Sequence, residues 1–151
     1  MKFAHTFRLV FIATMTCLAG ASAAADIEPL WPYEQNGVQY MSGGIGLDEA
    51  AAIAAAAPNY STLLGFAATG SGEYLSDVHV IIRQAEGRLL LDVISNGPFL
   101  LVNLVPGRYQ VVASYLGVEQ VKRIRVPIKA RVDTRFYWIV AAIRARTPSH
   151  R

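Results

Sequence analysis

Cysteine is almost absent from this chain, since Cys17 is the only one among 151 residues. It lies in an apolar N-terminal stretch that we expect to be removed on export, which would leave a mature protein without any thiol. Such a protein has no disulfide, no thiolate nucleophile and no cysteine-ligated metal. Small exported domains of eukaryotes often depend on disulfides, so their absence favours a bacterial periplasmic or secreted protein.

Histidine is also scarce, with only His79 and His150 beyond the first 25 residues. A hydrolytic zinc site needs three or four His, Cys or acidic ligands. A Ser-His-Asp triad would need His79 as its base, because His150 lies close to the chain end. Ser76 and Asp77 precede His79, but successive residues of a strand alternate between its two faces, so we expect His79 to be an outward strand residue. The sequence therefore predicts no enzyme, no metal site and no cofactor.

Long apolar runs are missing as well, and none could span a membrane. The stretch Leu9–Gly20 is apolar but short, with basic residues before it and small residues after it. Those are the three parts of a secretory signal peptide. We expect residues 1–25 to be this signal, with cleavage after Ala23 or after Ala25.

The net charge of the predicted mature chain is close to zero. Lys2 and Arg8 lie in the predicted signal, so 12 of the 14 basic residues remain against 11 acidic ones. The distribution is uneven, however. Residues 26–118 contain nine acidic residues and three arginines, whereas residues 119–151 contain nine basic residues and two acidic ones.

Two interpretations of this asymmetry stay open. Either the two halves interleave in space and neutralise each other, or the basic end forms a patch for an anionic partner. If the last two predicted strands pair, Arg123, Arg125 and Arg135 share an outward face, where like charges repel unless something compensates them.

Residues 26–60 predict an extended lead-in followed by one short helix. Prolines fix φ and remove backbone donors, so Asp26–Gly46 is expected to be irregular. The alanine-rich run 47–57 predicts the helix, with Gly46 as its N-cap, acidic residues in its first turn and a proline at its end. Its apolar face, expected to dock on a sheet, would consist of Leu47, Ala50, Ile53, Ala54 and Ala57.

From Thr62 onward the hydrophobic period is two, which indicates strands. Glycine and proline turns separate seven short segments: 62–69, 78–83, 89–93, 99–104, 109–115, 119–126 and 132–140. We expect their inward side chains to include Val80, Leu91, Tyr109, Val111 and Phe136. This spacing predicts a mainly β fold, a seven-stranded antiparallel Greek-key β-sandwich over residues 61–141, with 142–151 as a C-terminal tail.

Four runs in this region carry a family resemblance: Val78-His79-Val80-Ile81-Ile82, Gly87-Arg88-Leu89, Gly97-Pro98-Phe99, and Leu104-Val105-Pro106-Gly107-Arg108-Tyr109-Gln110-Val111. They resemble the carboxypeptidase regulatory-like domain, a prealbumin-like (transthyretin-type) sandwich. Val105 replaces the first proline of the usual Leu-Pro-Pro-Gly run. The resemblance covers residues 62–140, and the lead-in with its helix is similar to that of small exported proteobacterial proteins carrying this domain alone.

The resemblance implies a fold and says little about function, since this sandwich serves many roles. One enzyme family with the transthyretin-type fold, the hydroxyisourate hydrolases, uses a Tyr-Arg-Gly-Ser ending. This chain ends with Thr147-Pro148-Ser149-His150-Arg151 and lacks that ending. The hydrolase interpretation is therefore disfavoured.

Four aromatic residues, Trp31, Tyr33, Tyr40 and Tyr74, lie in loops or in the lead-in. Exposed rings at such positions stack on sugars or dock a partner. In the alternative interpretation, Trp31 and Tyr33 cover an open edge or face of the sandwich.

We therefore expect an exported, non-enzymatic binding or accessory module that contacts another envelope or secreted protein, with a carbohydrate-binding module as the alternative. We expect neither a nucleic-acid partner nor a membrane span. Docking a protein needs an open strand edge or an apolar patch, whereas binding a glycan needs two coplanar exposed rings. The candidate contact residues are Trp31, Tyr33, Tyr40, Tyr74, Arg123, Arg125 and Arg135.

Overall fold

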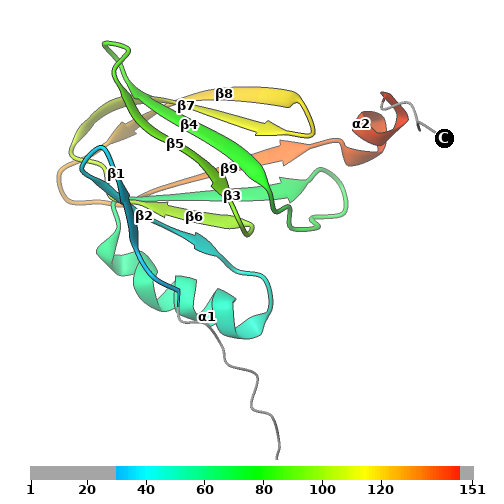
Figure 1. Cartoon of the computed structure of the whole chain (residues 1–151), viewed down its shortest axis with the longest axis horizontal. Helices are drawn as coiled ribbons and strands as arrows, with labels where there is room; N and C mark the ends of the chain where they lie inside the picture. Colours follow the sequence, from blue (N-terminus) through cyan, green and yellow to red (C-terminus); the bar gives the residue numbers. More distant parts are fainter. Residues whose placement is uncertain (1–29, 147–151) are drawn as a thin grey trace, which may run out of the picture.

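The computed structural model describes residues 30–146. The predicted signal peptide, with Ala23 and Ala25, and the chain end from Thr147 lie outside the described residues. The described part is mainly β, with two sheets and two α-helices (Figure 1). The elements are β1 (Tyr33–Gln35), β2 (Val38–Gly43), α1 (Leu47–Ala56), the 3-10 turn η1 (Ala57–Asn59), β3 (Thr62–Ala68), β4 (Val78–Gln84), β5 (Leu89–Ser95), β6 (Phe99–Val102), β7 (Gly107–Tyr115), β8 (Val118–Val126), β9 (Val132–Trp138) and α2 (Val140–Arg146).

The strands form a five-stranded sheet of order β1-β2-β6-β3-β9 and a four-stranded sheet of order β5-β4-β7-β8. Each of the seven predicted segments is a strand, β3 to β9, but the described residues contain nine strands. The antiparallel prediction is wrong for one pair, since β3 and β9 run parallel, with Phe66 opposite Phe136. Parallel neighbours need a long crossover between them, and here five intervening strands supply it.

The lead-in was predicted to be irregular, and this prediction is wrong, because the lead-in contains a hairpin. β1 and β2 pair antiparallel, and β2 extends the sheet by pairing with β6. Their connection is Asn36-Gly37, with φ of 51° and 78°. Positive φ at both positions marks a tight turn whose twist suits a hairpin. Asn-Gly between two short extended segments is a strong sequence signal for a hairpin. It was overlooked because the nearby prolines favoured an irregular backbone.

Helix α1 confirms the predicted alanine helix to within a residue at its end. Ile53 of this helix is buried against Met41 and Leu101 on the outer face of the five-stranded sheet. Ala57, which follows the last helical residue, is buried in the same cluster. Leu47, however, is 90% exposed, so the predicted apolar face is wrong at the helix start, as it is at Ala54, which is exposed.

The first turn of α1 is held by a side chain rather than by packing. The Glu49 carboxylate accepts hydrogen bonds from the backbone N–H groups of Gly44 and Ile45, at 3.0 and 2.9 Å. This arrangement satisfies donors just before the helix and places negative charge at its positive end. Leu47 can therefore remain in solvent.

The predicted tail begins inside a second helix, α2, which was not predicted from the sequence. Ile143 is buried and Val140 packs against the main core. Two aliphatic residues three positions apart lie on the same side of a helix, and this pair attaches α2 to the end of β9.

The main core lies between the two sheets. All five residues predicted to point inward, Val80, Leu91, Tyr109, Val111 and Phe136, are buried. Phe66, Phe136 and Trp138 form its aromatic centre, with ring centroids 6.1 to 6.4 Å apart. The period of two therefore predicted the inner face of these strands correctly.

Candidate functional site

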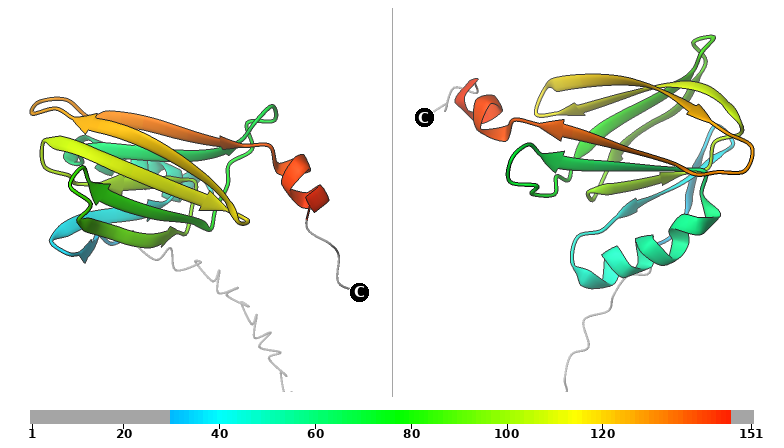
Figure 2. Two further views of the ribbon diagram at one scale, coloured as in Figure 1. Left: turned by 90° about the horizontal axis from the view of Figure 1, so that it is seen from above. Right: turned by 180° about the vertical axis from the view of Figure 1, so that it is seen from behind.

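The two sheets differ in what covers their outer faces. α1 lies on the outer side of the five-stranded sheet, and α2 lies at the end of β9 (Figures 1 and 2). Among residues 30–146, no helix covers the outer side of the four-stranded sheet. We call this surface of β5, β4, β7 and β8 the open face.

The centre of the open face is apolar. Ile81 lies opposite Val112, and Val112 lies opposite Val121, so the three form a row across β4, β7 and β8. Ile81 and Val112 are half-buried by their neighbours, whereas Val121 on the edge strand is 51% exposed. We call this row the apolar strip. Aliphatic side chains gathered on an uncovered sheet face are typical of a contact surface.

Four arginines, Arg83, Arg108, Arg123 and Arg125, lie beside the apolar strip on the same face. Arg108 is directly opposite Arg125, and Gln110 connects the other two, lying opposite Arg83 on one side and Arg123 on the other. We call these four the arginine cluster. Arg108, Arg123 and Arg125 line one cavity of about 410 Å³.

Within the described residues, no member of the arginine cluster forms an ion pair, and Glu86 is the acidic residue that borders a depression with Arg108 and Arg125. The ion pairs of the described residues are His79–Asp92 and Arg131–Asp133, and neither includes a member of the cluster. Like charges directly opposite each other on a sheet are destabilising. A face that keeps them unpaired is suited to an anionic partner.

The other end of the open face lacks arginines. His79 is exposed there, as predicted, and lies opposite Ser114, which in turn lies opposite Glu119. The Nε2 of His79 lies 2.6 Å from a carboxylate oxygen of Asp92, which lies on β5 opposite Ile81 and so continues the row of the apolar strip. The arginines are therefore at one end of the open face, whereas Asp92 lies level with the apolar strip and Glu119 lies beyond it.

The third predicted arginine lies elsewhere. β8 pairs with β7 and β9 pairs with β3, so the two basic strands belong to different sheets. Arg135 lies opposite Gly65 on the five-stranded sheet, where its aliphatic stem is close to Gly65. Arg123 and Arg125 thus lie together without Arg135, and Arg83 and Arg108 join them instead. The cross-strand position of Arg108 was not available from the sequence without the β7–β8 register.

The predicted aromatic residues divide into three groups. Trp31 and Tyr33 are exposed and line the same cavity, of about 190 Å³, together with Ser42, Glu49 and Asn96. Tyr40 is half-buried, and its ring stacks on that of Tyr33 with centroids 5.6 Å apart. Tyr74 lies apart from them, with its ring edge against Phe99 at 5.2 Å.

The lead-in hairpin also closes a sheet edge. The Gln35 side-chain amide pairs with β5, accepting from the Asp92 N–H at 2.6 Å and donating to the Asp92 carbonyl at 3.3 Å. The Asn36 amide donates to the Leu90 carbonyl at 3.2 Å. These amides occupy backbone groups that an added strand would otherwise use. β5 is therefore a poor edge for docking a peptide strand.

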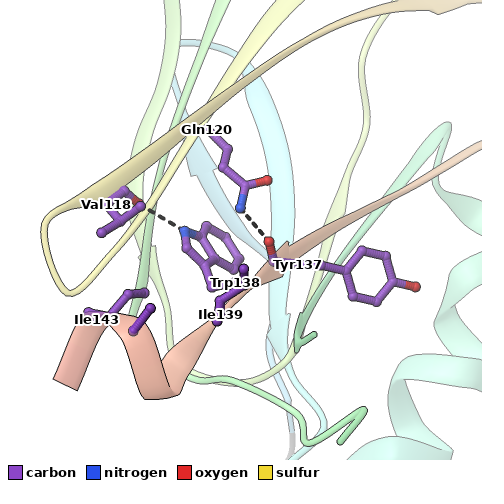
Figure 3. A pocket seen from close by; sticks show the side chains of 7 residues that line it. Val118, Gln120, Tyr137, Trp138, Ile139 and Ile143 are labelled. Atoms are coloured by element: carbon purple, nitrogen blue, oxygen red, sulfur yellow. Dashed lines mark hydrogen bonds between the residues drawn. The ribbon is translucent and has the colours of Figure 1, made fainter. Parts of the chain in front are cut away.

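A shallow apolar notch lies where β8, β9 and α2 meet (Figure 3). It has a volume of about 270 Å³. The Trp138 indole donates to the Val118 carbonyl at 2.9 Å, and the Gln120 amide donates to the Tyr137 carbonyl at 2.5 Å. The Tyr137 ring points away from the notch in Figure 3. No carboxylate or imidazole lines it, so it offers packing rather than acid–base chemistry.

Tyr109 fixes the loop between β6 and β7. Its hydroxyl donates to the Val105 carbonyl at 2.6 Å. Burial raises the pKa of this phenol above its usual value of 10.0, and the nearby Arg88 opposes the rise. The phenol therefore stays protonated and remains a donor throughout the neutral range. This bond holds Val105 at the surface of the loop.

The described residues do not bring together a metal-binding group of three or more His, Cys, Asp or Glu side chains. Within the same residues, His79 is bonded to Asp92, and no serine or threonine hydroxyl bonds to its ring. No helix of residues 30–146 has the length and apolar character required to cross a bilayer. No family model matches the chain, and no curated protein matches its sequence.

Proposed function

We propose that this chain is an exported, non-enzymatic docking module that contacts another envelope or secreted protein through its open face. The observation that carries the proposal is the uncovered four-stranded sheet, with an apolar strip beside an unpaired arginine cluster. Apolar side chains supply area that is removed from water on contact. Unpaired arginines supply orientation and faster association with an acidic surface.

The fold proposed with this function is a Greek-key sandwich of the prealbumin-like, carboxypeptidase regulatory-like type. The chain alternates between the sheets, from β3 to the pair β4–β5, then to β6, the pair β7–β8 and finally β9. Repeated crossing between two packed sheets supports a Greek-key connection. The four sequence runs that carry the family resemblance fall on β4, β5, β6 and β7 with their turns.

A photo-crosslinking residue placed at Val121 tests the docking role in the living source bacterium. We expect Val121 to trap a discrete partner, because this side chain is the most exposed member of the apolar strip. The same residue placed at Leu47, which is 90% exposed on α1, is the matched control. Arg123→Glu/Arg125→Glu should abolish the product at Val121.

The partner would be identified by mass spectrometry of the crosslinked product, and N-terminal sequencing of the recovered protein should begin at Ala24 or Asp26 if it is exported as proposed. Equal products at Val121 and Leu47, or a Val121 product that survives the double substitution, would rule out the open face as the docking surface. A mature N-terminus at Met1 would contradict export.

Glycan binding is the second candidate, supported by the cavity that Trp31 and Tyr33 share with Glu49 and Asn96. Rings with adjacent amide and carboxylate groups suit a sugar, whose faces are apolar and whose edges carry hydroxyls. Calorimetry against envelope oligosaccharides tests it. Binding should fall at least tenfold in Trp31→Ala and stay unchanged in Tyr74→Ala. If the parent chain gives no heat of binding, or if the two variants lose affinity equally, this cavity is excluded as a glycan site.

A further inference from the structure

Two of the most exposed aliphatic side chains of the described residues lie at one end of the molecule. Val105 is 68% exposed in the loop between β6 and β7, and Ile128 is 82% exposed in the loop between β8 and β9. Both loops turn at the end of the molecule away from α2 (Figures 1 and 2). Val105 and Ile128 line the same surface depression, so both exposed side chains lie at this end of the molecule.

These tips are held in place rather than loosely exposed. The Tyr109 hydroxyl holds the Val105 carbonyl at 2.6 Å. Prolines at positions 106 and 127 follow Val105 and precede Ile128, and proline restricts the backbone of each loop. An exposed isoleucine side chain gains free energy when contact with an apolar phase or partner removes it from water.

Basic side chains lie just behind the tips. Arg108 and Arg125 line the cavity next to Ile128, and Lys129 follows Ile128 in the loop. Arg131 does not add to this charge, because its guanidinium is bonded to Asp133 at 2.6 and 2.9 Å. Glu86 and Glu34 are the acidic residues that line these two depressions. Three unpaired basic groups against two acidic ones leave an excess of positive charge.

We propose that this end docks on an anionic phospholipid bilayer, with Val105 and Ile128 inserted at the boundary between head groups and acyl chains and Arg108, Arg125 and Lys129 on the lipid phosphates. Protruding aliphatic tips with basic groups set behind them match the order of a bilayer surface, where phosphates lie outside the acyl chains. Long basic side chains can bury their stems and keep their charge at the phosphates. Two aliphatic residues alone give weak binding, so anionic lipid is required.

This surface shares Arg108 and Arg125 with the arginine cluster, but it does not include the apolar strip of the open face. Docking at the loops would leave Ile81, Val112 and Val121 free for a protein partner, because they lie further along the strands from this end. The inference therefore goes beyond the proposed docking function. Its test uses pure lipid vesicles, so it can fail without bearing on the protein partner.

The first experiment measures co-sedimentation of the full chain with phosphatidylcholine vesicles with and without 30 mol% phosphatidylglycerol. Residues 1–29 are identical in every variant, so comparison among variants isolates the loops. Lys129→Gln should weaken binding to the anionic vesicles about fivefold, and Ile128→Ser about tenfold or more. Leu47→Ser removes an aliphatic side chain on α1 that is even more exposed, 90% against 82% for Ile128, and should leave vesicle binding unchanged.

The second experiment places a tryptophan at each tip and reads its depth. Ile128→Trp should be quenched by brominated acyl chains in anionic vesicles at low salt, and the quenching should vanish in 1 M salt, where charges are screened beyond ~3 Å. Leu47→Trp, the control, should not be quenched. Equal quenching at the two positions, or sedimentation of Ile128→Ser and Lys129→Gln equal to that of the parent chain, would overturn the proposal. Failure of the tip to bind either vesicle would assign these loops to a protein contact instead.

Discussion

Replacing Phe136 with alanine should lower the free energy of unfolding by about 3–5 kcal/mol. The ring is fully buried between the sheets, with the rings of Phe66 and Trp138 each 6.1 Å away between centroids. The Lys122 ammonium also lies 5.1 Å from the ring centroid. Truncation would leave a cavity bounded by two sheets whose strands are fixed by ladder hydrogen bonds and cannot collapse into it.

The measurement is urea unfolding of Phe136→Ala beside Tyr137→Ala. Tyr137 is the next residue of β9, points to the other face and is 48% exposed, so its truncation should cost less than about 1 kcal/mol. A Phe136→Ala midpoint equal to that of the parent chain would show that this ring does not contribute to the core. Equal losses in the two variants would show that β9 is sensitive to any truncation.

Most of the seven strands of the domain were predictable because only one face of each is buried. A half-buried strand must alternate apolar and polar residues, and that alternation is visible from Val78 to Ile82 without any knowledge of the partner strand. The same reasoning placed Val111 and Phe136 inward. β3 and β6 are buried on both faces and are instead short apolar runs between turns. Helix α1 was equally accessible, since alanine content and acidic residues in the first turn are local properties.

The pairing of strands was less accessible, because the register depends on residues far apart in the sequence. The alternation places Arg123 and Arg125 on an outer face but cannot say which strand lies beside them. β8 pairs with β7, so Arg108 joins these arginines, whereas β9 pairs with β3 and carries Arg135 to the other sheet. Half of the arginine cluster was therefore missed although every member lies on a predicted strand or at its end.

The lead-in hairpin was missed for a different reason. Residues near Pro29 and Pro32 suggest irregular backbone, and β1 is only three residues long. Its stability comes chiefly from a tertiary contact, the Gln35 amide on β5, and from the cross-strand stacking of Tyr40 on Tyr33. Local sequence patterns do not predict such contacts. The Asn36-Gly37 turn is the local signal for the hairpin.

Replacing Gly97 with alanine should cost about 3 kcal/mol, a large effect for a single methyl group. A Cβ at this position would lie 2.3 Å from the Gly43 carbonyl oxygen and 2.4 Å from its carbon. Both are backbone atoms of β2, which is itself fixed by pairing with β6. The Gly97 carbonyl in turn accepts a hydrogen bond from the buried Ser95 hydroxyl at 2.8 Å. β2 cannot move away from the turn that contains Gly97 without breaking its hydrogen bonds to β6.

Gly107→Ala is the matched control for this position. A Cβ there would meet its nearest neighbour, the Tyr109 hydroxyl, at 3.5 Å, which is an ordinary contact. Neither glycine has a positive φ, so the two variants differ in the clash and not in backbone strain. Thermal unfolding should show a large decrease in the midpoint temperature for Gly97→Ala and a small change for Gly107→Ala.

Hydrogen exchange reads the same clash locally. Because Gly97 lies against β2, the added methyl group should weaken the pairing of the hairpin with the sheet and raise the hydrogen-exchange rates of the β2 amides. An unchanged midpoint for Gly97→Ala would mean that β2 does not lie this close to the turn. The cavity that Trp31 and Tyr33 share with Asn96 would then be contradicted as well, because it lies between β2 and this turn.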